Sequence, residues 1–217
     1  PEFVDINKNN YTIDTNKIED KIKKLKKKVK AIIAVDYAGH PCDWVSLKFL
    51  AKKYNLRLIN DNCHALGAKI NNDKKYACKY ADIVTHSYHP VKNITTGEGG
   101  AILTNNYELF QKILIFRNNG MVKQKDRYWE YRVNELSMNF RITDIQCALG
   151  ISQLKKLNVF IKKRNKIAKE YNNIFKEKKN IIIPKLDREI SHAYHLYPLL
   201  INFNKTKITK KKFFYKL

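Results

Sequence analysis

Short apolar segments alternate with segments of helical periodicity through the first half of this 217-residue chain. Ala31–Val35 is a continuous apolar run, which suits a strand buried on both faces, and a helical pattern separates it from the next apolar run at residues 56–59. Residues 82–85 and 101–104 continue the order as strands, and Tyr107–Arg117 as a helix. Alternation of this kind predicts an α/β fold with a mostly parallel sheet covered by helices on both faces.

Polar residues mark where the predicted helices begin. Asp43 is expected to cap the helix before residues 56–59, because an Asp side chain can accept from the free backbone N–H groups of a first turn. Thr143 and Asp144 open a second, long helical pattern that runs to Tyr171. Residues 120–134 mix charged and aromatic side chains without a clear period, which indicates an exposed loop.

The composition is typical of a soluble globular protein, with 44% apolar and 29% charged residues. A formal net charge of +23 raises the alternative of a nucleic-acid-binding module. The lysines are spread along the chain, however, and no recognised nucleic-acid-binding motif accompanies them, so nucleic acid is an improbable partner. Four cysteines without a CxxC pair suggest reduced thiols in a cytoplasmic protein, and no apolar run approaches membrane-spanning length.

A lysine and an aspartate follow two of the predicted strands. Lys92 comes after the apolar segment at residues 81–85 and before the glycine-rich turn at residues 97–100, and Asp61 follows residues 56–59 after the single residue Asn60. Pyridoxal 5'-phosphate (PLP) needs an amine that forms a Schiff base and a carboxylate that keeps its pyridinium nitrogen protonated. The pair therefore suggests PLP chemistry, with a surface lysine and a turn or cap aspartate as the alternatives.

Several motifs together resemble the sugar-nucleotide aminotransferases of the DegT type, which are PLP-dependent transferases with the aspartate aminotransferase fold, fold type I. The resemblance runs from about Phe3 to about Tyr197. Within the family, residues 3–6, 38–44 and 148–154 are most similar to the pseudaminic acid branch. That similarity implies transfer of an amino group from glutamate to C4 of a UDP-linked 4-keto-6-deoxy-N-acetylhexosamine. The motifs that carry the resemblance are Asp61, His64 and Gly67, residues 87–92 with 97–100, and residues 138–146 with Gln153 and Leu154.

The resemblance implies a role for five residues. Lys92 would hold the cofactor covalently and move the α proton of the donor, while Asp61 would pair with the pyridinium nitrogen. His64 would lie beside the cofactor ring, and the Ser87 hydroxyl would bind the phosphate. Asn139 would reach the phosphate of a neighbouring subunit, which implies a homodimer with shared active sites.

The chain departs from the family pattern at one position next to the proposed site. Family members usually carry Glu before the ring-binding aspartate, whereas this chain has Asn60. The histidines and Cys63 near the site fit no tetrahedral metal pattern, so we expect no metal. His192 and His195 either face the sugar nucleotide or pack in the interior.

By comparison with the family, residues 1–150 correspond to a partial PLP-binding large domain. Residues 151–217 correspond to a linker helix and a truncated small domain, with strands expected at residues 181–183 and 196–201. The chain begins with Pro1 and is short for the family, so we expect a fragment that binds PLP weakly or not at all on its own. The alternatives are an aminotransferase for another 4-keto sugar nucleotide and a remnant without catalysis. Lys92 argues against the related dehydratases, which have histidine at this position.

Overall fold

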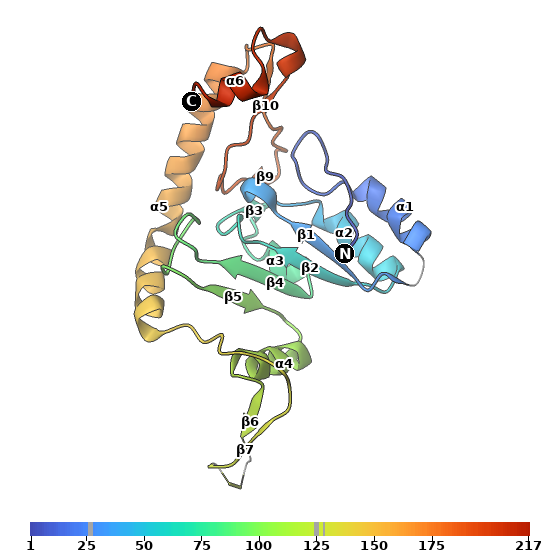
Figure 1. The fold of residues 1–217 in the computed structure, drawn as a ribbon, viewed down its shortest axis with the longest axis vertical. Helices are drawn as coiled ribbons and strands as arrows, with labels where there is room; N and C mark the ends of the chain where they lie inside the picture. The colour runs from blue at the N-terminus through green and yellow to red at the C-terminus, as the bar shows by residue number, and fades with distance from the viewer. Residues whose placement is uncertain (26–27, 124–125, 128) are drawn as a thin grey trace.

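A four-stranded sheet lies at the centre of the computed structural model, which describes residues 1–25, 28–123, 126–127 and 129–217 (Figure 1). The strands lie in the order β1 (Ala31–Val35), β2 (Arg57–Asp61), β4 (Ile83–Ser87) and β5 (Gly100–Leu103). The first three are parallel, and β5 is antiparallel to β4. The predicted α/β fold with a mostly parallel sheet is confirmed.

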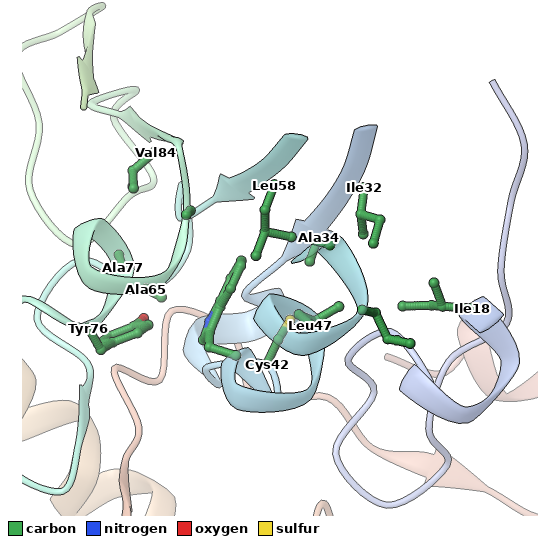
Figure 2. Close-up of a cluster of buried hydrophobic side chains, with 14 of the residues drawn as sticks. Ile18, Ile32, Ala34, Cys42, Leu47, Leu58, Ala65, Tyr76, Ala77 and Val84 are labelled. Carbon is green, nitrogen blue, oxygen red and sulfur yellow. The ribbon is translucent and has the colours of Figure 1, made fainter. Parts of the chain in front are cut away.

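Three helices contribute side chains to one buried core, packed against alternate residues of the strands. They are α1 (Thr15–Leu25), α2 (Trp44–Lys53) and α3 (Tyr76–Tyr80). Asp43 caps α2 as predicted, since its carboxylate accepts a 3.0 Å hydrogen bond from the backbone N–H of Ser46. The core that these elements enclose is labelled in part in Figure 2 and includes Ile18, Ile32, Ala34, Leu47, Leu58, Tyr76 and Val84.

The opposite face of the sheet is open, so the prediction of a sheet covered on both faces is wrong for the described residues. Ile33, Val35 and Ile102 are 61%, 38% and 53% exposed. The parallel strands lie side by side in the same order as in the chain: β1, β2, β4. Right-handed connections that all step in the same direction across a sheet place their helices on the same face. The strand pattern predicted the sheet but not this one-sided covering.

An arm of two short antiparallel strands extends away from the sheet beyond α4 (Tyr107–Arg117) (Figure 1). The strands are β6 (Met121–Lys123) and β7 (Tyr131–Val133), with Met121 opposite Val133. The expectation of an irregular loop at residues 120–134 is therefore wrong where the strands are described, although β7 is exposed as expected. Strands of three residues are too short to show an alternation of apolar and polar side chains in the sequence.

The long helix α5 (Asp144–Phe175) begins where the sequence predicted. The Thr143 side chain accepts from the backbone N–H of Gln146, and the Gln146 side chain accepts from the backbone N–H of Thr143, which is a complete capping box. Residue 150 lies inside this helix, and the division into domains after residue 150 stays a prediction. In the described part of the chain, no helix is both long and apolar enough to cross a bilayer.

The chain after α5 forms short strand pairs, one of them with a strand from the first half of the chain. The strands β8 (Ile181–Ile182) and β10 (Leu200–Ile201) pair with each other, and β3 (Lys69–Ile70) pairs with β9 (Ile190–Ser191). The strands expected at residues 181–183 and 196–201 are limited to these two-residue segments; the backbone N–H of Leu196 donates to Ala38, and Pro198 has no N–H to donate to a strand. The remaining elements are the 3-10 turns Tyr37–Gly39 and Phe203–Lys205 and the helix α6 (Lys210–Phe214).

Candidate active site

The predicted site residues Asp61 and Ser87 are the last residues of two neighbouring parallel strands, β2 and β4. Asp61 lies in register with Thr85 of β4, so both strands end at the same edge of the sheet. The carboxyl edge of parallel strands is where ligands bind in open α/β sheets. One carboxylate oxygen of Asp61 accepts a 3.1 Å hydrogen bond from the backbone N–H of Cys63, which holds the turn after β2.

Lys92 lies in the loop that leaves β4, and this loop is closed by its own backbone. Its N–H donates to His89 at 2.9 Å, and the N–H of Tyr88 donates to Gly99 at 2.8 Å. The buried side chain of Asn93 then donates to the backbone oxygen of Leu66 at 2.9 Å. This bond ties the loop of Lys92 to the turn after Asp61, so the two predicted catalytic residues belong to one connected site.

The charges of Lys92 and Asp61 both affect the pKa values of residues in the turn after β2. Burial lowers the pKa of His64, the Lys92 ammonium lowers it further, and Asp61 opposes both effects. Burial likewise raises the pKa of the Cys63 thiol to about 11, with Asp61 adding to the rise. Lys92 and Asp61 therefore both act electrostatically on His64, and the lowered pKa favours the neutral form of its ring.

A second histidine joins this group from the C-terminal part of the chain. The ring centroid of His195 lies 4.5 Å from that of His64. Burial, then His64 and Lys92, lower the pKa of His195 to about 4, and its buried Nδ1 has no partner among the described residues. The guanidinium of Arg164 on α5 donates to the backbone oxygen of His195 at 3.2 Å and so holds it there. Of the two readings left open, His195 therefore lies at the site.

His192 instead packs in the interior, where it is 4% exposed. Its ring is stacked on Tyr194 at 3.9 Å, and its Nδ1 accepts a 2.8 Å hydrogen bond from the backbone N–H of Tyr194. The ring of His40 meets it edge-on at 5.4 Å. Because burial and the neighbouring His40 oppose a positive charge, the pKa of His192 falls to about 3.

This buried histidine should make the protein sensitive to acid. The folded-state pKa of His192 lies below the ordinary value of 6.5, so the unfolded state binds more protons as the pH falls from 6.5 toward 3. Stability present at neutral pH should therefore be lost through that window. In urea titrations of the full-length protein, His192→Asn, whose Oδ1 can still accept from Tyr194, should remove about 1–3 kcal/mol of the loss between about pH 7 and 4.5. An unchanged pH dependence in the variant would contradict this assignment.

The two remaining predicted residues differ in their placement. Ser87 is partly buried at the end of β4, and its hydroxyl oxygen accepts from the backbone N–H of His89 at 3.4 Å. Asn139 lies on an exposed segment between the β6–β7 arm and α5, where its side-chain oxygen accepts from the backbone N–H of Arg141 at 3.1 Å. The structure thus brings Lys92, Asp61, His64 and Ser87 to one sheet edge and leaves Asn139 outside that group.

The donor set at this edge fits PLP. It offers a primary amine on Lys92, a carboxylate on Asp61, a neutral imidazole on His64 and a hydroxyl on Ser87, all partly buried. No group of three or more His, Cys, Asp or Glu side chains among the described residues is arranged to hold a metal ion.

Sequence reasoning did not single out two residues that support the site, Asn93 and Asp36. Asn93 joins two loops that are distant in the sequence, as described above. Asp36 is fully buried directly after β1 and hydrogen-bonds to the side chains on both sides of Asp61. The sequence indicated Asp36 only by its position directly after the apolar run at residues 31–35.

Comparison with known proteins relates the chain to aminotransferases. A model of the DegT/DnrJ/EryC1/StrS aminotransferase family matches residues 1–217. An uncharacterized protein of Methanocaldococcus jannaschii is 41% identical over 219 residues, which cover 98% of this chain and 55% of that protein. The UDP-4-amino-4,6-dideoxy-N-acetyl-beta-L-altrosamine transaminase of Campylobacter jejuni is 41% identical over 200 residues, which cover 92% of this chain and 52% of the transaminase.

A solved structure agrees with these relatives. Helicobacter pylori PseC, described as an aminotransferase involved in the biosynthesis of pseudoaminic acid, superposes with a TM-score of 0.83 and 37% identity, covering 100% of this chain and 54% of its own. The chain spans about half the length of the curated relatives that it matches. With the family model matching along its whole length, the chain belongs to the DegT/DnrJ/EryC1/StrS aminotransferase family.

Proposed function

We propose that the protein is a PLP-dependent sugar-nucleotide aminotransferase whose catalytic residues are Lys92 and Asp61. The observation that carries the proposal is the placement of these two residues on loops at one sheet edge, which the Asn93 side chain joins and where the charges of both act on His64. Family membership and the aminotransferase named among the relatives support it. When bound, PLP supplies an electron sink for the carbanion that forms at the amino-bearing carbon.

The residues of this chain would divide the work by their chemistry. The Lys92 amine would hold the cofactor covalently, and once free it would take the α proton from the donor amino acid and return it to the cofactor carbon. The Asp61 carboxylate accepts the hydrogen bond of the pyridinium N–H and keeps that nitrogen protonated. His64 lies beside the ring as a neutral imidazole, and Ser87 donates its hydroxyl to the phosphate.

For the substrate, we propose a UDP-linked 4-keto-6-deoxy-N-acetylhexosamine, with glutamate as the amino donor. The names of the Campylobacter jejuni and Helicobacter pylori relatives support the sugar nucleotide, and the amino donor is proposed from the family resemblance. The net charge of +23 would favour approach of the pyrophosphate. Another 4-keto sugar nucleotide is the second candidate, because the residues that meet at the sheet edge recognise the cofactor and not the sugar.

The reverse transamination tests the substrate. Full-length protein loaded with PLP, when given the UDP-linked 4-amino sugar and 2-oxoglutarate, should convert 2-oxoglutarate to glutamate and leave the 4-keto sugar. The same 4-amino sugar linked to dTDP or GDP should react about ten times more slowly or worse, because contacts with the base are lost. Glutamate release with the dTDP- or GDP-linked sugar alone would overturn the UDP assignment and leave the aminotransferase assignment in place.

We also propose that the working unit is a homodimer in which Asn139 completes the site of the other subunit. Asn139 lies outside its own chain's group of site residues, between Met138 and Phe140, which are 65% and 59% exposed. An exposed apolar segment that carries a polar side chain suits a contact between two copies. Two-fold symmetry would then give each copy the same shared site.

Mixing two inactive proteins tests this sharing. Lys92→Ala and Asn139→Ala homodimers should each be poorly active, whereas a mixed dimer would contain one site with both residues intact. After subunit exchange, about a quarter of wild-type activity should return, because half of the dimers are mixed and each has one intact site of two. Subunit exchange can be followed with two affinity tags. Proven exchange without any recovery would place Asn139 outside the partner's site.

A further inference from the structure

A buried carboxylate supports the strand that carries Asp61. Asp36 directly follows β1 and has no exposed surface. Five hydrogen-bond donors converge on its two oxygens at distances between 2.8 and 3.2 Å: the backbone N–H of Cys42 and the side chains of Trp44, Asn60, Asn62 and Tyr76. Donors drawn from β2, α2 and α3 and from the loops between them make Asp36 the junction of these elements. Burial raises the pKa of Asp36, and the hydrogen bonds act against that rise.

Two of these donors are the immediate neighbours of Asp61. The Nδ2 of Asn60 lies 3.2 Å and the Nδ2 of Asn62 lies 2.8 Å from the same oxygen of Asp36. The backbone N–H of Asp36 also donates to the backbone oxygen of Asp61 at 3.0 Å. Successive side chains of a strand point to opposite faces, so fixing residues 60 and 62 on the core side fixes the direction of Asp61 on the open side.

We propose that Asp36 is a positioning residue that aims the Asp61 carboxylate into the site. This inference rests on the proposed function, since it gives Asp61 the cofactor nitrogen as its target. The Asp61 carboxylate accepts a hydrogen bond from the backbone N–H of Cys63, two residues further along the same turn. The direction of this side chain therefore depends on its backbone, and the backbone depends on Asp36.

The same cluster explains why the chain has asparagine at residue 60. A glutamate at this position would place a second carboxylate within about hydrogen-bond distance of Asp36, and like charges that close disfavour each other's ionisation. The amide of Asn60 donates a hydrogen bond instead. The departure of residue 60 from the family pattern is thus matched to the carboxylate at residue 36.

The Cys63 thiol offers a readout that needs no cofactor. Asp61 helps to raise the pKa of this thiol to about 11, so a displaced Asp61 carboxylate should lower the pKa and raise the thiolate fraction. We expect Asp36→Asn to increase the alkylation rate of Cys63 by about three- to tenfold near pH 9, since one pKa unit changes the thiolate fraction tenfold. Asp61→Ala gives the full size of the effect, and peptide mass spectrometry assigns the rate to Cys63.

Two further variants separate positioning from general loosening. Leu47→Ala removes a fully buried core side chain of α2 without touching Asp36 or Asp61, and its Cys63 rate should stay close to wild type. Asp36→Asn combined with Asn60→Asp returns one carboxylate and one amide to the cluster, and it should recover part of the wild-type rate. If Asp36→Asn does not fold, Asn62→Ala removes one of the two neighbours that hold Asp61 and should change the Cys63 rate in the same direction.

The loaded full-length protein gives the second readout. Asp36→Asn should lower kcat by about 100-fold, the size expected from a misplacement of about 1 Å, with little change in the KM of the sugar nucleotide. A Cys63 rate that rises no more in Asp36→Asn than in Leu47→Ala would overturn the positioning role, whatever the activity. If the protein binds no PLP, the proposed function fails, while the thiol rates still decide whether Asp36 holds Asp61.

Discussion

Replacement of Lys92 with alanine should remove transamination almost completely. The variant loses both the amine that holds the cofactor and the base that moves the proton, so kcat should fall by about a thousandfold or more. Alanine at residue 92 leaves the loop intact, because the loop is held by backbone bonds and by the Asn93 side chain. Borohydride reduction of the loaded wild-type protein, followed by peptide mass spectrometry, should find the cofactor attached at Lys92.

The matched control is Lys48→Ala, which removes an exposed lysine on α2, outside the two loops of the site. It should keep wild-type activity, and the cofactor should still be trapped at Lys92. Covalent attachment at another lysine, together with an active Lys92→Ala protein, would show that the amine lies elsewhere. Loss of activity in both variants would show that the effect comes from removing positive charge and not from this amine.

Local pattern was enough to predict the elements that carry the site. The continuous apolar run of Ala31–Val35 predicted β1, and Thr143 with Gln146 produced the capping box at the start of α5. Strand ends at Asp61 and Ser87 followed from the apolar runs before them, and in a parallel sheet such ends share an edge. The grouping of four of the five predicted site residues could therefore be reached without coordinates.

Features that depend on long-range contacts could not be predicted in this way. The open face of the sheet follows from the direction of the crossovers, which no single strand reveals. Asn93 looks like any loop asparagine until its amide is seen between two backbone oxygens, those of His64 and Leu66. His195 is separated from His64 by more than half of the chain, and only the fold brings their rings to 4.5 Å.

The position of Asn139 shows a different limit. The family resemblance implies that it reaches the cofactor of a neighbouring subunit, and the structure of one chain places it on an exposed segment. The pattern and geometry of one chain show the local bond of the Asn139 side chain to Arg141, and a contact with a second copy would not be visible in them. Its role stays a prediction, which the mixing experiment decides.

Removal of the charge of Asp61 should have the second large effect. In Asp61→Asn the side-chain oxygen can still accept from the backbone N–H of Cys63, so the turn after β2 should survive. The amide cannot hold the pyridinium nitrogen protonated, and the electron sink is weakened. We expect kcat to fall by about 100- to 1,000-fold, which corresponds to about 3–4 kcal/mol of transition-state stabilisation. Cofactor content should fall much less, since Lys92 and Ser87 still hold the aldehyde and phosphate ends.

Asp82→Asn is the control that separates charge at the site from charge on the sheet. Asp82 lies at the opposite end of β4, immediately before its first residue, and its carboxylate accepts a 2.8 Å hydrogen bond from the backbone N–H of Leu58. The substitution therefore makes the same chemical change to a carboxylate that also accepts from a backbone N–H. Because Asp82 lies away from the site, turnover should stay within about threefold of wild type. Near-normal turnover in Asp61→Asn would show that another group protonates the ring. Each of the two carboxylates accepts one hydrogen bond from a backbone N–H, but only Asp61 lies at the edge of the sheet that carries the site. An equal loss of turnover in both variants would therefore trace the effect to the stability of the sheet.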